Sequence, residues 1–237
     1  MEKGQLLYEG KAKRIYQTNE EEVLWVAYKD SATAFNGLKK EEILGKGHLN
    51  NEITSLLFEK LTQEGIENHF IKQLSSTEQL VKKVEIIPLE VVVRNVIAGS
   101  LAKRLGMDEG IVLDQAIIEF YYKDDELGDP FVADDHIRVL NIATPEELTV
   151  LRTLAAAVNQ VIEPYFATLN ITLVDFKLEF GKTSEGKIIL ADEISPDTCR
   201  LWDKNTNEKL DKDLFRRELG DITQAYQKIL DKLKGDN

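Results

Sequence analysis

The sequence contains very little cysteine and histidine. Its 237 residues include one cysteine, Cys199, and three histidines, His48, His69 and His136. A single cysteine excludes a disulfide within the chain and fits a reducing, cytoplasmic compartment. The histidines are scattered without the close spacing of metal ligands, so a zinc site is not expected.

Long hydrophobic runs and an excess of positive charge are also missing. No apolar stretch approaches the ~18 residues of a membrane span, and the N-terminus, MEKGQLLYEGK, lacks the apolar core of a signal peptide. The 30 Lys and Arg residues are outnumbered by 42 Asp and Glu residues, which gives a net charge of −12. We therefore expect neither a membrane nor nucleic acid as a partner, because nucleic-acid binding needs a basic field. A small anionic ligand is compatible with this charge, since a local group of cations or a metal can hold one.

Strands and helices are predicted without strict alternation. Alternating apolar residues and turn signals predict strands over residues 5–17, 23–29, 79–87 and 89–97, and a hairpin of 171–180 and 187–194 around TSEG. Helical spacing and end signals predict helices over 46–64, 100–105 and 213–234, and another that starts at Thr144 and kinks or ends at Pro164. This order indicates the α+β class. A boundary near Pro88 would divide the chain into 1–87 and 88–237.

Two familiar nucleotide-binding motifs nearly occur. Residues 4–11 resemble a P-loop, but five residues separate the outer glycines instead of four, and Ala12 stands where a P-loop has its magnesium-binding Ser or Thr. Residues 45–50, GKGHLN, depart from G-x-G-x-x-G at Asn50 and follow no clear strand. We interpret both as chance matches.

Charged and apolar residues alternate in LVDFKLEFG, residues 173–181. Asp175, Lys177 and Glu179 fall on one face of the predicted strand. On spacing alone, the solvated face of an edge strand explains this pattern. The returning strand changes the balance, because a symmetric turn at TSEG places Asp192 opposite Lys177, with Glu179 as its diagonal neighbour. Glu179 and Asp192 would then form a carboxylate pair suited to Mg²⁺, and Lys177 could neutralise a transferring phosphoryl group.

Two lysines precede an apolar strand residue in GKAKRIY, residues 10–16. Lys11 and Lys13 are expected to share a strand face with Ile15. A hairpin with two lysines can close over phosphates, as the glycine-rich flap of kinases does. A surface strand with extended lysine side chains explains the same pattern equally well.

Arg94 is a single fixed charge within the apolar strand LEVVVRNVI, and a buried arginine needs a partner. Ser100 is expected as the N-cap of the next helix, whose free amides can bind a phosphate. Together they indicate a phosphate monoester site, although an ordinary cap and a salt-bridged arginine fit as well. Asp197 and Arg200, in DEISPDTCR, are expected in a loop that follows the metal-binding strand.

Together these segments resemble the phosphoribosylaminoimidazole-succinocarboxamide synthase (SAICAR synthetase) family. The similarity is carried by YEGKAKRIY, LVKKVEIIPLEVVVRNVIAGSLAKRLG, LVDFKLEFG and ADEISPDTCRLWDK, which occur in family order over nearly the whole chain. The resemblance implies an α+β fold with an N-terminal nucleotide-binding lobe, similar to ATP-grasp and kinase lobes, and a larger α+β C-terminal lobe. It implies an ATP- and Mg²⁺-dependent ligase, commonly a homodimer. This ligase joins L-aspartate to the carboxylate of carboxyaminoimidazole ribonucleotide in purine biosynthesis.

The resemblance also implies roles for single residues. ATP contacts are implied for Lys11, Lys13, Ile15, Leu24, Val81, Lys82, Ile87, Lys123, Glu179 and Asp192, with the last two as magnesium ligands. Substrate contacts are implied for Glu90, Arg94, Ser100, Asp129, Asp175, Lys177, Asp197 and Arg200, with Asp175 and Lys177 as the catalytic pair.

Two other functions fit parts of the pattern. A small-molecule kinase of the inositol-phosphate type also has an Asp-x-Lys strand and a later acidic metal ligand, but it needs no aspartate. A catalytically silent nucleotide-binding module would be expected to lack Glu179 or Asp192, and both are present. Dependence of ATP cleavage on L-aspartate separates the ligase from the kinase.

Overall fold

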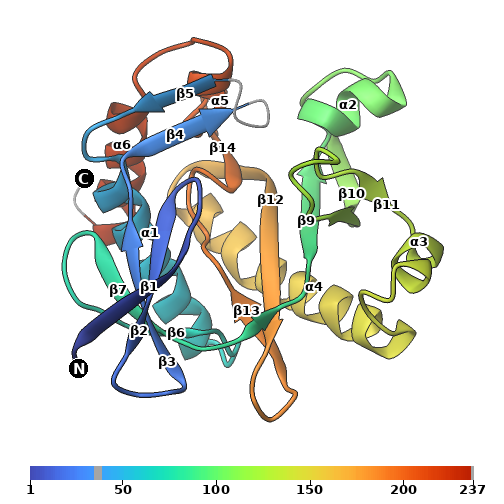
Figure 1. Ribbon diagram of the computed structural model, residues 1–237. Coiled ribbons are helices and arrows are strands. Elements are labelled where there is room, and N and C mark those ends of the chain that lie inside the picture. Colours follow the sequence, from blue (N-terminus) through green and yellow to red (C-terminus); the bar gives the residue numbers. More distant parts are fainter. Residues whose placement is uncertain (35–38, 236–237) are drawn as a thin grey trace.

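The structure is a computed structural model that describes residues 1–34 and 39–235 (Figure 1). Helices and strands are mixed along the chain, which confirms the α+β class. The strands are β1 (Lys3–Glu9), β2 (Lys13–Thr18), β3 (Val23–Tyr28), β4 (Ser31–Ala34), β5 (Lys39–Glu42), β6 (Phe70–Gln73), β7 (Glu78–Lys82), β8 (Glu85–Ile86), β9 (Leu89–Val96), β10 (Val112–Tyr122), β11 (Phe131–Val132), β12 (Ile171–Lys182), β13 (Ile188–Ala191) and β14 (Cys199–Asp203). The helices are α1 (Lys46–Gln63), α2 (Gly99–Leu105), α3 (Asp134–Val139), α4 (Pro145–Thr168), α5 (Asp213–Arg216) and α6 (Ile222–Lys234).

The N-terminal sheet has the strand order β1-β2-β3-β7-β6, and its neighbouring strands are antiparallel. The single strand expected over 5–17 is wrong, because β1 and β2 form a hairpin with its turn at 10–12. The Gly10 N–H donates to the Lys13 carbonyl (2.8 Å), and the Lys29 N–H donates to the Ala12 carbonyl (2.8 Å). Apolar residues flank the turn on both sides, so alternation alone did not reveal it.

The central sheet has the order β11-β10-β9-β12-β13, and β14 and β8 also pair with β12. β12 lies in the middle of the molecule, with α4 behind it (Figure 1). The predicted hairpin of 171–180 and 187–194 is confirmed as β12 and β13. Arg200 was expected in a loop, but it belongs to β14, which pairs with β12.

One hydrophobic core joins residues from both sides of the predicted boundary at 87/88. Leu57 of α1 belongs to the same buried cluster as Leu178 of β12 and Tyr226 of α6. The single strand predicted over 79–87 is wrong: β7 pairs within the N-terminal sheet, whereas β8 pairs with β12. The chain therefore changes sheets just before Pro88, and the division into 1–87 and 88–237 stays a proposal.

The helices α1, α2 and α4 confirm three predicted segments. Thr144 caps α4, because its side chain accepts from the Glu147 N–H (3.2 Å) while the Glu147 carboxylate accepts from the Thr144 N–H (3.0 Å). α4 does not end at Pro164 but continues to Thr168. The single helix predicted over 213–234 is wrong, because Asp221 caps a new helix, α6, after α5 has ended. Within residues 1–34 and 39–235, no helix has the length and hydropathy needed to cross a bilayer.

Candidate active site

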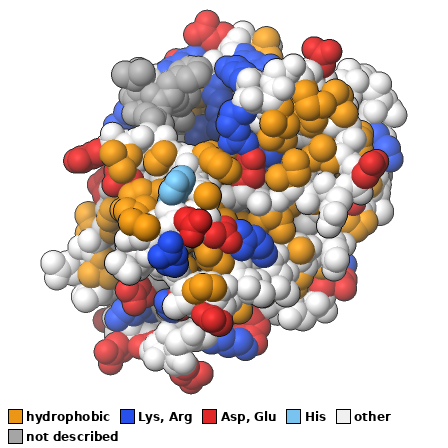
Figure 2. All heavy atoms as spheres, turned by 90° about the vertical axis from the view of Figure 1, so that its right-hand side faces the viewer, with side chains coloured by type: hydrophobic (Ala, Val, Ile, Leu, Met, Phe, Trp, Pro, Cys, Tyr) orange, Lys and Arg blue, Asp and Glu red, His pale blue; other side chains and the backbone are white. Residues whose placement is uncertain are grey.

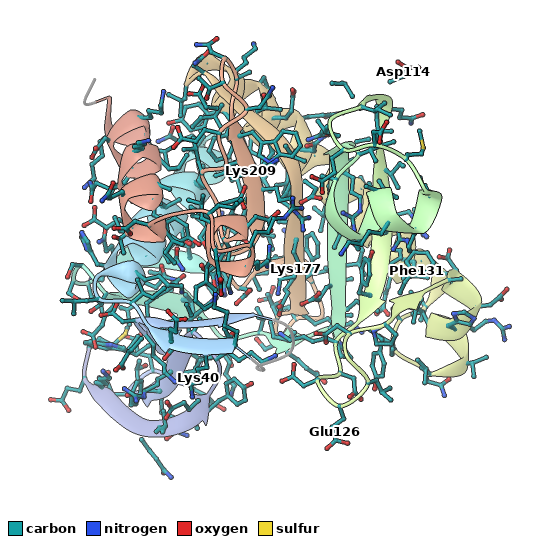
Figure 3. All side chains as sticks on the ribbon, turned by 90° about the horizontal axis from the view of Figure 1, so that it is seen from above. Lys40, Asp114, Glu126, Phe131, Lys177 and Lys209 are labelled. Atoms are coloured by element: carbon teal, nitrogen blue, oxygen red, sulfur yellow. The ribbon has the colours of Figure 1, made fainter. Side chains whose placement is uncertain are left out.

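The alternation in β12 separates an apolar face from a charged face. The apolar face belongs to the hydrophobic core and carries Phe176, Leu178 and Phe180. Asp175 and Glu179, on the opposite face, are only 4% and 2% exposed. Lys177, between them, lies near the centre of the molecule (Figure 3). The solvated edge strand is therefore the wrong interpretation, since β12 is an interior strand whose charged face is enclosed.

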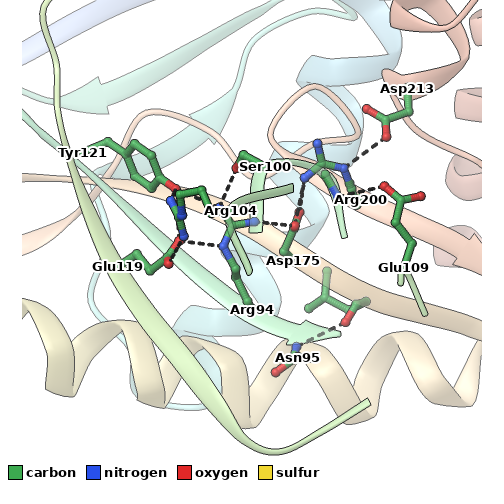
Figure 4. A network of polar contacts seen from close by, with 12 residues as sticks. Arg94, Asn95, Ser100, Arg104, Glu109, Glu119, Tyr121, Asp175, Arg200 and Asp213 are labelled. Atoms are coloured by element: carbon green, nitrogen blue, oxygen red, sulfur yellow. Dashed lines mark hydrogen bonds and ion pairs between the residues drawn. The ribbon is translucent and has the colours of Figure 1, made fainter. Parts of the chain in front are cut away.

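Asp175 lies between two arginines from neighbouring strands (Figure 4). Its register partner on β9 is Arg94, and its register partner on β14 is Arg200. Asp175 Oδ2 lies 2.9 Å from Arg94 Nη1 and 2.8 Å from Arg200 Nη1. Strand pairing therefore places the Asp175 carboxylate between the Arg94 and Arg200 guanidinium groups.

Further polar groups that the sequence did not reveal hold these arginines. Arg94 Nε lies 2.7 Å from Glu119 Oε2, and its Nη2 donates to the Tyr121 hydroxyl (3.0 Å). Arg200 Nε lies 3.1 Å from Asp213 Oδ2. Glu119 and Tyr121 alternate along β10, so recognising that strand would have placed them on one face.

Ser100 contacts Arg94 but does not cap α2 as expected. The N-cap of α2 is Ala98, which makes no side-chain cap bond. The Ser100 hydroxyl instead accepts from Arg94 Nη2 (3.1 Å). The Gly99 N–H donates to Glu109 Oε1 (2.9 Å), so the first amide of this turn is occupied by a carboxylate.

Lys177 joins three carboxylates on the charged face. Its Nζ lies 2.6 Å from Glu179 Oε1, 3.0 Å from Glu90 Oε1 and 4.0 Å from Asp192 Oδ2. Burial alone would lower the pKa of Lys177, but the attraction of Glu179, Glu90 and Asp192 outweighs it and holds the pKa well above the usual value. Lys177 is therefore protonated at neutral pH.

Two more lysines neutralise the same carboxylates. Lys123 pairs with Glu179, and Lys13 pairs with Asp192 and with Glu193, which the sequence did not single out. Burial opposes the charged form of Asp192, but Lys13 and Lys177 hold its pKa well below the ordinary range. The cluster is therefore a compact set of opposite charges, in which Glu179 is buried and the lysine side chains reach the solvent to different extents.

Asp192 reaches this cluster by a different route from the one predicted. Glu179 is paired with Ala191, so the register differs by one residue from the one that would place Asp192 opposite Lys177. A slip of one residue normally sends a side chain to the other face. β13 ends at Ala191, however, and Asp192 adopts a left-handed backbone conformation with φ 59°. This local conformation directs its carboxylate toward Lys13 and Lys177.

Lys11 and Lys13 do not share a strand face as expected. Lys11 lies in the turn before β2, with its Nζ 2.7 Å from Asp125 Oδ1. Strand pairing and alternation put four of the predicted ATP contacts on one face of the N-terminal sheet, namely Lys13, Ile15, Leu24 and Val81. Lys82 is exposed and alternates to the opposite face. The buried Ile87 donates its N–H to the Phe180 carbonyl (2.9 Å).

A cavity of about 420 Å³ lies between the N-terminal hairpin and the charged face. Its walls bring together Lys11, Glu90, Arg94, Ser100, Asp175, Lys177, Asp192, Asp197 and Arg200. Asp129 is not part of these walls as far as the structure describes the chain. Its side chain accepts from the Asp124 N–H (3.0 Å) and closes the loop between β10 and β11.

The acidic residues fit a magnesium ion that arrives with phosphate oxygens. Glu179 and Asp192 both lie at Lys177, and Mg²⁺ commonly takes one or two carboxylates together with phosphates and water. In the described part of the chain, no group of three or more His, Cys, Asp or Glu side chains is placed to hold a metal by itself. The donor set therefore matches a nucleotide-bound ion better than a closed protein cage.

Comparison with known proteins decides the family. The model of the SAICAR synthetase family matches residues 6–233. This chain belongs to the SAICAR synthetase family. A phosphoribosylaminoimidazole-succinocarboxamide synthase from Bacillus cereus (strain G9842) is 68% identical over 235 residues, which cover 99% of this chain and 98% of that relative.

Solved structures of SAICAR synthetases share the fold over the same extent. The enzyme from Ehrlichia chaffeensis is 47% identical with a TM-score of 0.94, covering 97% of this chain and 98% of that one. A SAICAR synthetase (Type-2) in complex with ADP is also 47% identical, with a TM-score of 0.93, covering 96% and 97%. The resemblance found in the sequence is therefore confirmed for nearly the whole chain.

Proposed function

We propose that this chain is the ATP-dependent ligase that joins L-aspartate to the carboxylate of carboxyaminoimidazole ribonucleotide, giving the succinocarboxamide nucleotide, ADP and phosphate in purine biosynthesis. Full-length membership of the SAICAR synthetase family carries this proposal. The ADP complex of a solved relative supports the use of ATP here. The cavity supports it further, since several anionic substrates need a site with fixed positive charge.

In this proposal, Arg94, Arg200 and Ser100 bind the phosphate of the ribonucleotide. All three line the cavity, and the two guanidinium groups are held by Asp175. Arginine suits this role because its planar fork can donate two parallel hydrogen bonds to a phosphate. Asp175 then acts on the substrate side by fixing both arginines.

ATP binds beside the N-terminal sheet, where Lys11 and Asp192 form part of the cavity wall. Lys11, Lys13 and Lys123 contact its phosphates, while the sheet face with Ile15, Leu24 and Val81 takes the base, with Lys82 and Ile87 at its edge. Glu179 and Asp192 hold Mg²⁺, which when bound supplies charge neutralisation on the phosphate oxygens. The pairing of these carboxylates with Lys13, Lys123 and Lys177 holds them in place before the nucleotide enters.

Lys177 lines the cavity and pairs with Glu179, which places it between the two proposed binding sites. The γ-phosphoryl group moves to an oxygen of the substrate carboxylate as its bond to ADP breaks, which gives an acyl phosphate with a good leaving group. The aspartate amine then attacks the acyl carbon and loses a proton, and inorganic phosphate leaves. The fixed ammonium group of Lys177 stabilises the negative charge that gathers in both steps. Glu90 orients Lys177 (3.0 Å), and Asp129 orders the loop whose Asp125 pairs with Lys11.

The test is a three-substrate assay with purified protein, ATP and Mg²⁺. ADP and the succinocarboxamide nucleotide should form together only when the ribonucleotide and L-aspartate are both present. Steady ADP formation without aspartate, with a phosphorylated product, would favour the kinase. With aspartate omitted, positional exchange in oxygen-labelled ATP should occur when the ribonucleotide is present and not when it is absent, because the acyl phosphate forms before aspartate reacts.

The proposed enzyme is a cytoplasmic homodimer, as the family resemblance implies. Hydrophobic side chains are exposed on the face formed by α2, β10, β11 and α3 (Figure 2), among them Leu105, Val112, Phe131 and Val139. Such a surface favours association with another protein surface. Light scattering should give twice the chain mass of 26.9 kDa, and a mass of one chain at every concentration would contradict the dimer.

A further inference from the structure

A fully buried lysine lies behind the cavity wall at the start of α1. Lys46 is 0% exposed, and its Nζ lies 2.7 Å from Asp197 Oδ2. The same oxygen lies 3.3 Å from Lys212 Nζ, and Asp197 Oδ1 accepts from the Tyr226 hydroxyl (2.7 Å). One carboxylate is thus shared by two ammonium groups and a phenol.

The position of Lys46 in α1 would otherwise suit an apolar side chain. It lies three and seven residues before Leu49 and Ile53, on the face of α1 that packs in the core. A buried ammonium group is costly to desolvate, and a well-packed apolar residue often replaces a buried ion pair without loss of stability. Stability alone therefore gives no reason for a charge at this position.

The cluster has one side in the core and one side at the cavity. Asp197 and Lys212 line the cavity, whereas Lys46 does not. Both oxygens of Asp197 already have partners, so this carboxylate is poorly placed to bind a substrate cation. Lys212, with a side chain 13% exposed, has further N–H donors that Asp197 does not use.

We infer that Lys46 is a positioning residue: through Asp197 it holds the Lys212 ammonium group at the cavity wall, where Lys212 binds an oxyanion of a substrate. This inference rests on the proposed ligase function. Two lysines and one carboxylate leave one net positive charge in the cluster, and the neutral Tyr226 hydroxyl does not cancel it. The ligand chemistry is a carboxylate or phosphate oxygen, which aspartate, the ribonucleotide and ATP could each supply.

The neighbours of Lys212 act on its charge in opposite directions. Burial lowers the pKa of Lys212, Asp197 raises it, and Lys46 of α1 and Arg216 of α5 lower it further. Tyr226 of α6 stays protonated, because burial and Asp197 raise its pKa well above the usual value. Removing Lys46 should therefore keep Lys212 protonated to higher pH, whereas removing the charge of Asp197 should do the reverse.

The experiment measures kcat and the KM of each substrate against pH for the wild type, Lys46→Met, Asp197→Asn, Lys212→Arg and Lys212→Met. The alkaline loss of kcat/KM should move up by about one pH unit in Lys46→Met and down by a similar amount in Asp197→Asn. Lys212→Arg should remove this alkaline loss, because a guanidinium group stays charged. Lys212→Met should raise the KM of one substrate about tenfold or more, and that substrate supplies the oxyanion.

Lys60→Met is the matched control, since Lys60 lies on the same helix and pairs only with Glu64 among the ion pairs of the described residues. Its pH profile should equal that of the wild type. If the wild type itself shows no aspartate-dependent ligation, the proposed function fails. If the wild type is active and the other variants all behave like Lys60→Met, only the inference about Lys46 and Lys212 fails. Circular dichroism melting identifies any variant that does not fold. If Lys46→Met does not fold, the pH profile of Lys212→Arg, at the cavity wall, tests the inference instead.

Discussion

Lys177 is the residue on which the carboxylates of the site converge. Its ammonium group is held by Glu90 and Glu179 and lies 4.0 Å from Asp192. A quarter of its side chain is exposed, so water can partly replace it when it is removed. Its charge should therefore matter more for the reaction than for folding.

Lys177→Ala should lower kcat/KM by about 10²–10³-fold, because a preorganised charge at the reacting group is lost. The melting temperature should fall by only a few degrees. The control is Lys182→Ala on the same strand. It removes an ion pair in which Lys182 Nζ lies 2.7 Å from Glu147 Oε1, and neither residue lines the cavity. A collapse of thermal stability with normal specific activity of the folded fraction would show that Lys177 is a structural residue.

Asp211 is a buried carboxylic acid that titrates near neutral pH. It accepts from the Leu201 and Asp213 N–H groups (2.8 Å each). Burial and the charge of Asp213 raise its pKa from 3.8 to about 7. The folded state therefore binds this proton more tightly than the unfolded state does. The contribution of Asp211 to the free energy of unfolding consequently falls as pH rises from 3.8 to about 7.

Asp211→Asn should remove that pH dependence. Between pH 5 and pH 8, the free energy of unfolding of the variant should improve relative to the wild type by about 2–3 kcal/mol. Urea unfolding at both pH values measures this difference. An equal difference at the two pH values would show that Asp211 is ionised in the folded protein throughout.

At the scale of the elements, the start of α2 is packed against the arginine of β14. Gly99 has a φ of 56°, and a Cβ atom there would lie 2.5 Å from Arg200 Nη2. A side chain at this position must displace the guanidinium group that Asp175 and Asp213 hold. The helix and the strand therefore approach so closely at Gly99 that no space remains for a Cβ atom.

Gly99→Ala should raise the KM of the ribonucleotide about tenfold or more and cost about 1–2 kcal/mol of stability. Gly106→Ala is the matched control, because Gly106 ends the same helix with φ 64° and has open space where its Cβ would lie. Both variants carry the left-handed backbone strain, but only the first meets Arg200. Equal kinetics in the two variants would show that Arg200 yields without loss of binding.

On the scale of the whole molecule, the predicted lobes share one core. α1 precedes the boundary at 87/88, yet its Leu57 and Phe58 belong to the cluster that contains Ile229 and Leu233 of α6. Removing 1–87 would expose the apolar side of α6 to water. The two proposed lobes are therefore not expected to be independent folding units.

A fragment of residues 88–237 should not unfold cooperatively, whereas the full chain should show one transition. Thermal melting followed by circular dichroism compares the two. A fragment that starts at residue 46, and so retains α1, is the informative control and should recover more helical signal. A cooperative transition in 88–237 alone would restore the boundary at 87/88 as a domain boundary.

The class of fold, the amphipathic strand β12 and the family could all be predicted without the structure. Those properties depend on local period and on segments that can be compared along the chain, such as Asp175, Lys177 and Glu179 at every second residue. Charged residues of the site, including Arg94, could be identified from the same local patterns. The split helices α5 and α6 could not, because the apolar spacing continues across Glu218 and Gly220.

Which charges meet depends on the packing of the folded chain. The left-handed backbone of Asp192 brings it to Lys177 despite a shifted register, and strand pairing places Arg200 beside Asp175. The buried Lys46 finds Asp197 across 151 positions of sequence. Such contacts depend on how strands and helices from distant parts of the chain pack against each other. The burial of apolar side chains in one common core determines that packing. The enclosed charged face that LVDFKLEFG presents is therefore a property of the assembled sheet.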